Sequence, residues 1–259
     1  MNSGQLRSVL YVDDEPDIRE IVRISLGLSK TLTVHTADSG EHALTLARAL
    51  LPDLVLLDVM MPGLDGPATL SRMRLDPIIS PIPVIFMTAK AMPKEVALLR
   101  EMGAAGVIGK PFDPMQLGTQ VISLWQGRPL PVAVSVPVVV ALTEDDSAGL
   151  RRQVTQFAAK FLRRTRDEAE RLHGLIDRIE PGDATAMAEL EQLAHRIHGS
   201  GSTFGFAAVS ECAAEIEQLI GGLKQRDTWA GTAIDAQTRL RLSECTHRLA
   251  REVEAAAVH

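Results

Sequence analysis

Five short apolar runs, each followed by a stretch with helical periodicity, restrict the fold of this chain more than any other feature of the sequence. The runs are Val9–Val12, Leu32–His35, Leu54–Leu57, Val84–Met87 and Gly106–Ile108. Amphipathic stretches begin near Pro16, Gly40, Gly66 and Pro93, and a last one follows Asp113. Because parallel strands need helical crossovers, this alternation predicts an α/β domain over residues 1–126, with a doubly wound, five-stranded parallel sheet covered by helices on both faces.

The composition changes after residue 126. Gly127, Pro129, Pro131 and Pro137 interrupt a valine-rich stretch. Glycine and proline at this density are typical of an extended connection between domains. We therefore interpret residues 127–142 as a Pro/Val-rich linker, with the alternative that its valines cover a domain surface or add a strand.

Strand signals end at this linker, and helical periodicity takes over in residues 143–259. Asp183 is placed to cap a helix at its N-terminus. Four long amphipathic helices with short connections predict an all-α antiparallel four-helix bundle. Their apolar positions run through Leu150–Ile179, Met187–Thr203, Val209–Leu223 and Ala233–Val253.

The charge balance argues against nucleic acid as a direct partner. The chain has 259 residues and a formal net charge of −6. Up to Trp125 there are 14 acidic and 11 basic side chains, and from Gln126 onward there are 19 and 16, so each half carries −3. Neither half has the clustered basic face that binding to a phosphodiester backbone needs.

Signals for secretion or membrane insertion are missing from the sequence. The first residues, Met1 to Gln5, have neither the basic region nor the apolar core of a signal peptide. The most apolar run, Val132–Leu142, is interrupted by a proline and is far shorter than the roughly 20 residues of a spanning helix. Cys212 and Cys245 are more consistent with buried thiols than with a disulfide. We therefore expect no membrane span and a cytoplasmic location.

Three carboxylates are expected at one edge of the predicted sheet. Asp13 and Asp14 directly follow the first strand, and Asp58 follows the third. Crowded like charges resist ionisation unless a cation compensates them, and Mg²⁺ suits a site with few carboxylates, several waters and a phosphoryl group. Thr88 ends the fourth strand and can donate a hydrogen bond, and Lys110 after the fifth supplies positive charge. These groups together can hold a phosphoryl group in line with Asp58.

At these positions the sequence resembles a response-regulator receiver domain, with a flavodoxin-like fold, over residues 6–125. The matching residues are Asp13-Asp14, Asp58-Val59-Met60-Met61-Pro62, Gly66, Thr88-Ala89 and Lys110-Pro111-Phe112. Capping of helices can explain any one of the acids, but it does not explain the whole set at these strand ends.

The resemblance implies a role for each residue of the set. Asp58 is the expected phosphoacceptor, and the receiver is expected to catalyse its own phosphorylation. Asp14 is an expected direct ligand of Mg²⁺, Asp13 acts mainly through water, and the backbone carbonyl of Met60 completes the protein ligands. Thr88 and Lys110 are expected to bind the phosphoryl oxygens, with Ala89 in support.

One position departs from the receiver pattern. Receivers usually carry Tyr or Phe three residues before the lysine, and here the residue is Val107. The aromatic part of the usual conformational switch therefore cannot operate in this chain.

In the second half, one histidine stands apart from the apolar face of its helix. At about 100° per residue, His195 falls about 140° from the centre of the stripe that includes Leu190 and Ile197, so we expect its ring to face solvent. Gly199, one turn away, would normally cost a helix about 1 kcal/mol relative to Ala, which suggests that another molecule approaches the imidazole closely. An exposed neutral imidazole is a competent nucleophile toward an activated phosphoryl group.

This stretch resembles a histidine phosphotransfer (HPt) domain over about residues 143–258. The resemblance rests on Ala194-His195-Arg196-Ile197-His198-Gly199-Ser200 followed by Phe204-Gly205, and on the four-helix context. It implies that His195 carries the phosphoryl group. The family usually has lysine where this chain has His198, so a protonated His198, helped by Arg196, is expected to neutralise the phosphohistidine.

Three simpler interpretations of the histidine stretch stay open. His195 can be an ordinary surface histidine. His195 and His198 can pair on a metal ion, although no Cys, Asp or Glu completes a convincing motif. Gly199-Ser200-Gly201 can suggest a dinucleotide loop, although no strand precedes it and Phe204 stands at the place of the third glycine.

The sequence contains no ATP-binding motif of a kinase, because Gly109-Lys110 is followed by proline and lacks the upstream glycine. The chain is therefore expected to receive phosphate from a histidine kinase and to exchange it between Asp58, His195 and the receiver domain of another response regulator. The alternatives are a binding regulator controlled by phosphorylation, and a phosphate sink, in which His195 is not a relay step. Whether the chain counts as an enzyme stays open.

Overall fold

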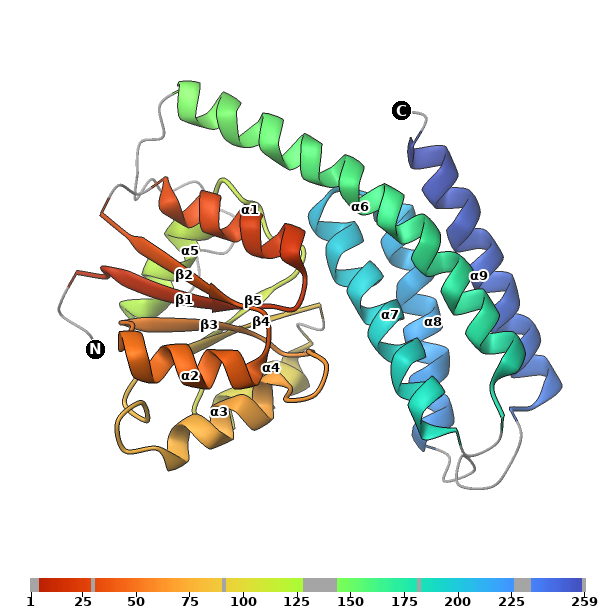
Figure 1. Cartoon of the computed structure of the whole chain (residues 1–259), viewed down its shortest axis with the longest axis horizontal. Helices are drawn as coiled ribbons and strands as arrows, with labels where there is room; N and C mark the ends of the chain where they lie inside the picture. The colour runs from red at the N-terminus through yellow and green to blue at the C-terminus, as the bar shows by residue number, and fades with distance from the viewer. Residues whose placement is uncertain are drawn as a thin grey trace. The chain divides into compact units, whose positions relative to one another are not determined.

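The computed structural model describes residues 5–28, 31–89, 92–127, 144–180, 183–225 and 234–257 (Figure 1). The chain divides into two compact units, residues 1–154 and residues 155–259. The predicted linker at 127–142 lies almost wholly outside the described residues.

The first unit contains a five-stranded parallel sheet with strand order β2-β1-β3-β4-β5. Strands β3 and β4 are buried along their whole length, because helices cover both faces of the sheet. The prediction of a five-stranded parallel sheet is therefore confirmed. The strands are β1 (Ser8–Val12), β2 (Thr33–Ala37), β3 (Leu54–Asp58), β4 (Val84–Thr88) and β5 (Gly106–Gly109).

Five helices connect and follow these strands. They are α1 (Pro16–Gly27), α2 (Gly40–Leu50), α3 (Gly66–Leu75), α4 (Pro93–Glu101) and α5 (Leu117–Trp125). Alternate strand residues such as Leu10, Leu57 and Phe86 share a buried apolar cluster with Ala43 of α2 and Leu70 of α3. Helices α1 and α5 pack against each other and contact β1, β2 and β5.

Local sequence signals account for several helix starts. Pro16 and Pro93 stand in the first turn of α1 and α4. A backbone N–H in the first turn has no acceptor within the helix, so proline, which lacks this N–H, breaks no hydrogen bond there. The side chain of Asp65 accepts a hydrogen bond from the N–H of Ala68 at 2.8 Å and caps α3. Each predicted helix start in this unit coincides with an observed one or lies within a few residues of it.

Gly66 is required by close packing between α3 and the end of β3. A Cβ atom at this position would lie 2.2 Å from the carbonyl oxygen of Asp58 and 3.0 Å from the ring of Phe86. Gly66→Ala is therefore expected to lower the free energy of unfolding by about 2–3 kcal/mol, because neither the backbone nor the buried ring can move away freely. Urea unfolding followed by circular dichroism measures the change.

A matched control for this prediction is Gly118→Ala in α5. A Cβ atom on Gly118 would meet nothing within 4 Å. Since alanine is the better helix former, this variant is expected to be as stable as the wild type or slightly more stable. Equal losses of stability in the two variants would contradict the packing explanation.

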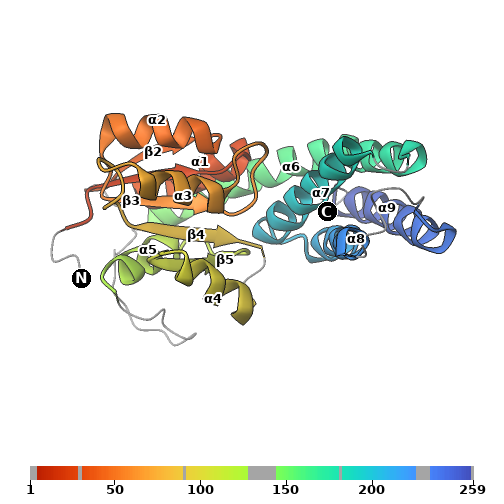
Figure 2. The same cartoon turned by 90° about the horizontal axis from the view of Figure 1, so that it is seen from below.

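The second unit is built from long helices, and Figures 1 and 2 show them side by side. Asp183 caps α7 as predicted, because its side chain accepts a hydrogen bond from the N–H of Ala186 at 2.9 Å. The helices are α6 (Glu144–Arg178), α7 (Ala184–Thr203), α8 (Ala207–Gln225) and α9 (Ala236–Ala257).

Contacts between these helices show that neighbours run in opposite directions. Phe161 in the N-terminal half of α6 stacks on Phe204, which follows the C-terminal end of α7, with ring centroids 5.2 Å apart. Near the other end of α6, the backbone carbonyl of Ile176 accepts a hydrogen bond from Arg239 at the start of α9. The predicted antiparallel four-helix bundle is confirmed.

Both cysteines are buried free thiols, in agreement with the sequence analysis. Cys212 lies in α8 and Cys245 in α9. Across the helices that the structure describes, none is both long enough and apolar enough to cross a membrane.

Candidate functional site

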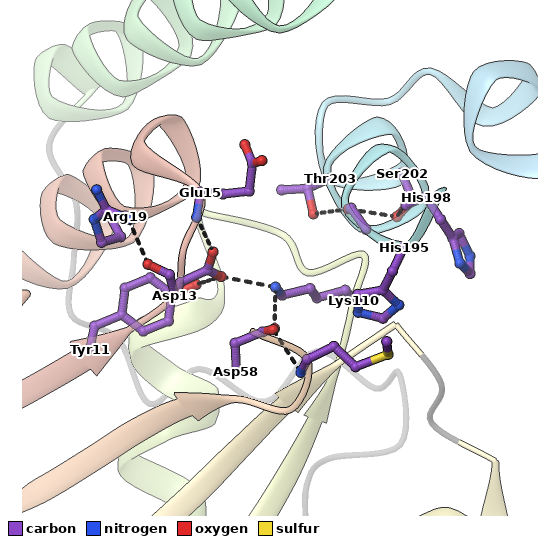
Figure 3. A network of polar contacts seen from close by, with 12 residues as sticks. Tyr11, Asp13, Glu15, Arg19, Asp58, Lys110, His195, His198, Ser202 and Thr203 are labelled. Atoms are coloured by element: carbon purple, nitrogen blue, oxygen red, sulfur yellow. Dashed lines mark hydrogen bonds and ion pairs between the residues drawn. The ribbon is translucent and has the colours of Figure 1, made fainter. Parts of the chain in front are cut away.

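The carboxyl ends of β1, β3 and β5 bring two buried carboxylates and one ammonium group together (Figure 3). Strand β1 pairs with β3, β3 with β4 and β4 with β5, so residues at these strand ends meet at one edge of the sheet. The ammonium of Lys110 lies 2.9 Å from Oδ2 of Asp13 and also donates to Oδ1 of Asp58. The sequence analysis predicted this grouping.

Donors from its own strand, from the turn that follows it and from α1 hold Asp13. Its Oδ2 accepts a hydrogen bond from the hydroxyl of Tyr11 at 2.5 Å, and its Oδ1 accepts one from the N–H of Glu15 at 2.8 Å. The guanidinium of Arg19 donates to the backbone carbonyl of Asp13 at 2.6 Å. Together with Lys110, the donors of Tyr11 and Glu15 fix the carboxylate in one orientation.

Asp58 is fixed by the turn that follows β3. Its Oδ2 accepts a hydrogen bond from the backbone N–H of Met60 at 3.0 Å, while Lys110 occupies Oδ1. The backbone N–H of Lys110 donates to the carbonyl oxygen of Thr88 at 2.7 Å, which joins the ends of β4 and β5 beside the carboxylate. Thr88 is buried, and Asp14 and Ala89 are half-buried.

The pKa values of Lys110 and Tyr11 are set by burial and by the carboxylates beside these two groups. Burial alone would lower the pKa of Lys110, but the nearby carboxylates of Asp13 and Asp58 outweigh burial and raise it above its ordinary value. Burial also raises the pKa of Tyr11, and the charge of Asp13 adds to the effect. Lys110 is therefore charged and Tyr11 is a neutral hydrogen-bond donor at neutral pH.

The donor chemistry of the site fits a hard divalent cation. Two buried carboxylates share one ammonium, so negative charge is left over, and Asp14 adds a third carboxylate. Among the described residues, no three His, Cys, Asp or Glu side chains are already arranged as metal ligands. Mg²⁺ does not need such an arrangement, since it keeps several waters and binds through one or two carboxylates.

The sequence analysis missed the residues that hold Asp13 in place. Tyr11 lies two residues before Asp13, and the strand period of two places both side chains on the same side of β1, which is a signal that was available. The backbone N–H of Glu15 donates to the carboxylate of Asp13, and the side chain of Arg19 donates to the backbone carbonyl of Asp13. Both contacts depend on the path of the chain into α1. No side-chain pattern in the sequence indicates them.

In the second unit, one carboxylate of α8 joins two histidines of α7. Nδ1 of His195 lies 3.0 Å from Oε1 of Glu217, and Nδ1 of His198 lies 3.0 Å from Oε2 of the same carboxylate. A carboxylate only accepts hydrogen bonds, so Nδ1 is the donor of each ring, and in the neutral form of the imidazole the lone pair then lies on Nε2. Figure 3 shows both rings leaving the same helix.

The prediction that His195 faces solvent is wrong, because its side chain is only 8% exposed. The helical wheel describes α7 alone, whereas the ring contacts a side chain of the neighbouring helix α8. Glu217 was also missed by the sequence analysis, although an acid beside Ala213, Ile216 and Ile220 on an apolar face is an available signal. A buried acid in such a stripe needs a partner.

The other predicted residues of this region lie on α7 as expected. Arg196 forms an ion pair with Glu168 of α6 at 3.0 Å, and burial is the first cause of a raised pKa for that glutamate. Gly199 is buried, and its carbonyl oxygen accepts a hydrogen bond from the hydroxyl of Thr203 at 2.9 Å. Because Gly199 and Gly201 lie inside a helix, they do not form a nucleotide-binding loop.

Comparisons with known proteins place both units in families. Residues 9–122 match the response regulator receiver domain, and residues 156–257 match the Hpt domain. The chain is 40% identical to the DNA-binding response regulator MtrA of Mycolicibacterium smegmatis over 113 residues, which is 44% of this chain and 48% of that protein. It is 37% identical to the response regulator Rre1 of Synechocystis over 110 residues, which is 42% of this chain and 48% of that protein.

A solved structure of the chemotaxis protein CheY4 of Vibrio cholerae is 28% identical, with a TM-score of 0.43, and the match covers 46% of this chain and 99% of that one. The chain spans about half the length of the curated relatives it matches.

Receiver domains generally bind Mg²⁺ at their phosphorylation site. Receiver and Hpt domains together imply interaction with histidine kinases and other phosphorelay components. The chain therefore joins a response regulator receiver domain to an Hpt domain, the phosphoryl-accepting domain types of two-component phosphorelay signalling.

Proposed function

We propose that this chain is a phosphorelay protein that accepts a phosphoryl group on Asp58 and carries one on His195. The observation that carries the proposal is the contact of Asp58 with the ammonium of Lys110 at the edge where the strands end. A nucleophilic oxygen and a fixed positive charge are there within reach of one phosphoryl group, which is most of what phosphoryl transfer requires of a protein.

In the receiver, each residue has a distinct task. The carboxylate of Asp58 attacks phosphorus, and the ammonium of Lys110 and the hydroxyl of Thr88 stabilise charge on the phosphoryl oxygens. Asp14, Asp58 and the backbone carbonyl of Met60 would hold Mg²⁺, with Asp13 acting through water. Bound there, Mg²⁺ would supply further positive charge to the phosphoryl oxygens.

In the Hpt domain, Glu217 prepares His195 for transfer. The hydrogen bond from Nδ1 of His195 to Glu217 fixes the tautomer and leaves Nε2 as the nucleophile. Arg196, Gly199 and His198 are supporting residues, and His198 stands where the resemblance to Hpt domains implies lysine.

The wider proposal concerns boundaries, partners and location. We infer a receiver domain over residues 1–126, a linker over 127–142 and an Hpt domain over 143–259. A histidine kinase is the donor, the receiver domain of another response regulator exchanges phosphate with His195, and the chain works in the cytoplasm. The free thiols Cys212 and Cys245 support a reducing compartment.

His195→Gln tests the relay. The intact protein is incubated with acetyl phosphate and Mg²⁺, and aspartyl phosphate (base-labile) and phosphohistidine (acid-labile) are separated by their stability. The variant is expected to keep the aspartyl phosphate and to lose most of the acid-labile phosphate, because glutamine has no nucleophilic ring nitrogen.

The control is His247→Gln, which removes a surface histidine of α9 whose Nδ1 bonds only to the backbone carbonyl of Ser243 in the described part of the chain. It is expected to label like the wild type. If the wild type itself acquires no acid-labile phosphate, the relay fails and a binding regulator controlled by Asp58 takes its place. If acid-labile phosphate forms only to be returned and hydrolysed at Asp58, the chain is a phosphate sink.

A further inference from the structure

Two histidines of α7 share one anchor. The carboxylate of Glu217 is 2% exposed and lies 3.0 Å from Nδ1 of His195 and 3.0 Å from Nδ1 of His198, one ring on each oxygen. The side chain of His198 is 21% exposed, against 8% for His195. His198 is therefore anchored on the same carboxylate as His195 and is more open to solvent.

The shared anchor makes the two imidazoles chemically alike. In the neutral form of a ring that donates Nδ1–H to a carboxylate, the lone pair lies on Nε2, and the carboxylate increases the electron density there. His198 meets the same condition as His195, because the second oxygen of Glu217 accepts its proton. The hydroxyl of Ser210 on α8 donates to the backbone carbonyl of His198 at 2.8 Å and holds that turn of α7 against α8.

We propose that His198 is a second phosphoryl-accepting residue of the Hpt domain. The inference rests on the proposed function, because it takes the same donor, an aspartyl phosphate of a receiver. The lone pair on Nε2 of His198 forms the N–P bond while the P–O bond to the aspartyl carboxylate breaks, and the carboxylate leaves as an anion. The Nδ1 proton stays on its hydrogen bond to Glu217, so the step needs no other proton transfer.

The geometry also orders the two sites. His198 follows His195 by three residues, which turns its side chain by about 60° around α7, so a receiver aligned on Nε2 of His195 is not aligned on Nε2 of His198. Misalignment of a reacting group commonly costs one to two orders of magnitude in rate. His195 is therefore the main acceptor and His198 the minor one.

The experiment compares the full-length wild type with His195→Gln, His198→Gln and the double variant. Each protein is incubated with acetyl phosphate and Mg²⁺, and tandem mass spectrometry under alkaline conditions maps the acid-labile phosphate. His195→Gln is expected to retain roughly a tenth of the wild-type acid-labile phosphate, mapped to His198. The double variant loses it, and His198→Gln keeps the label on His195.

Glu217→Gln provides a second readout, because its amide can accept from only one ring. The total phosphohistidine is expected to fall in this variant, because only one of the two rings keeps its acceptor. Label on His195 with none on His198 in the wild type, together with no acid-labile label in His195→Gln, would overturn the inference and leave the proposed function intact. Absence of all phosphohistidine from a wild type that is labelled on Asp58 would overturn both. Direct mapping on the wild type keeps the test valid even if a variant misfolds.

Discussion

Asp58→Asn is expected to abolish phosphoryl loading of the intact chain from acetyl phosphate and Mg²⁺. The amide of asparagine has no anionic oxygen to attack phosphorus, whereas it has the same shape as the carboxylate and its one oxygen still accepts a hydrogen bond from Lys110. Acid-labile phosphate on the Hpt domain is expected to vanish together with the aspartyl phosphate. Intact-mass analysis, which detects one added phosphoryl group per site, measures both losses.

The matched control is Asp65→Asn, a change of carboxylate to amide in the same loop. Asp65 is exposed and caps α3, and asparagine caps a helix about as well as aspartate does. This variant is expected to load like the wild type. Aspartyl phosphate that persists in Asp58→Asn would show that another carboxylate accepts the phosphoryl group. Asp13 is the first candidate, because it contacts the same ammonium of Lys110.

Lys110→Met is expected to destabilise the receiver by about 3 kcal/mol or more in the absence of divalent cations. The wild-type ammonium contacts the buried carboxylates of Asp13 and Asp58, and removing one partner of a buried ion pair leaves uncompensated charge. Thermal unfolding followed by circular dichroism measures the loss. Phosphoryl loading is expected to fall as well, because the developing charge on the phosphoryl oxygens loses its fixed cation.

Mg²⁺ separates this explanation from a simple loss of packing. A cation bound to the carboxylates replaces part of the missing charge, so added MgCl₂ should raise the midpoint of unfolding more in Lys110→Met than in the wild type. Lys94→Met removes an exposed lysine of α4 and is expected to change stability by less than about 0.5 kcal/mol. An equal response of wild type and Lys110→Met to MgCl₂ would show that the cation does not compensate for the missing ammonium.

Local patterns were sufficient to predict the architecture. Alternation of apolar runs with helical stretches is read within about ten residues, and strand–helix alternation permits few arrangements other than a parallel sheet. The same rule placed Asp13, Asp58 and Lys110 at one edge, because parallel strands all end on the same side. The structure confirms this grouping, which follows from the order of the parallel strands alone.

Contacts between separate elements escaped the sequence analysis. A helical wheel assigned His195 to solvent because it contains no neighbouring helix, and only the packing of α8 on α7 brings Glu217 to the ring. The same packing gives His198 the anchor that its sequence position alone does not suggest.

The sequence by itself determined which residues can do chemistry and which edge of the sheet holds the acids, since strand and helix periods act over short stretches of chain. The tertiary structure alone decided which partners those residues have. Glu217 of α8 contacts two histidines of α7 through hydrogen bonds that form only where the two helices pack against each other. Hydrogen bonds form over about 3 Å, and only the folded chain brings donors and acceptors from distant segments that close.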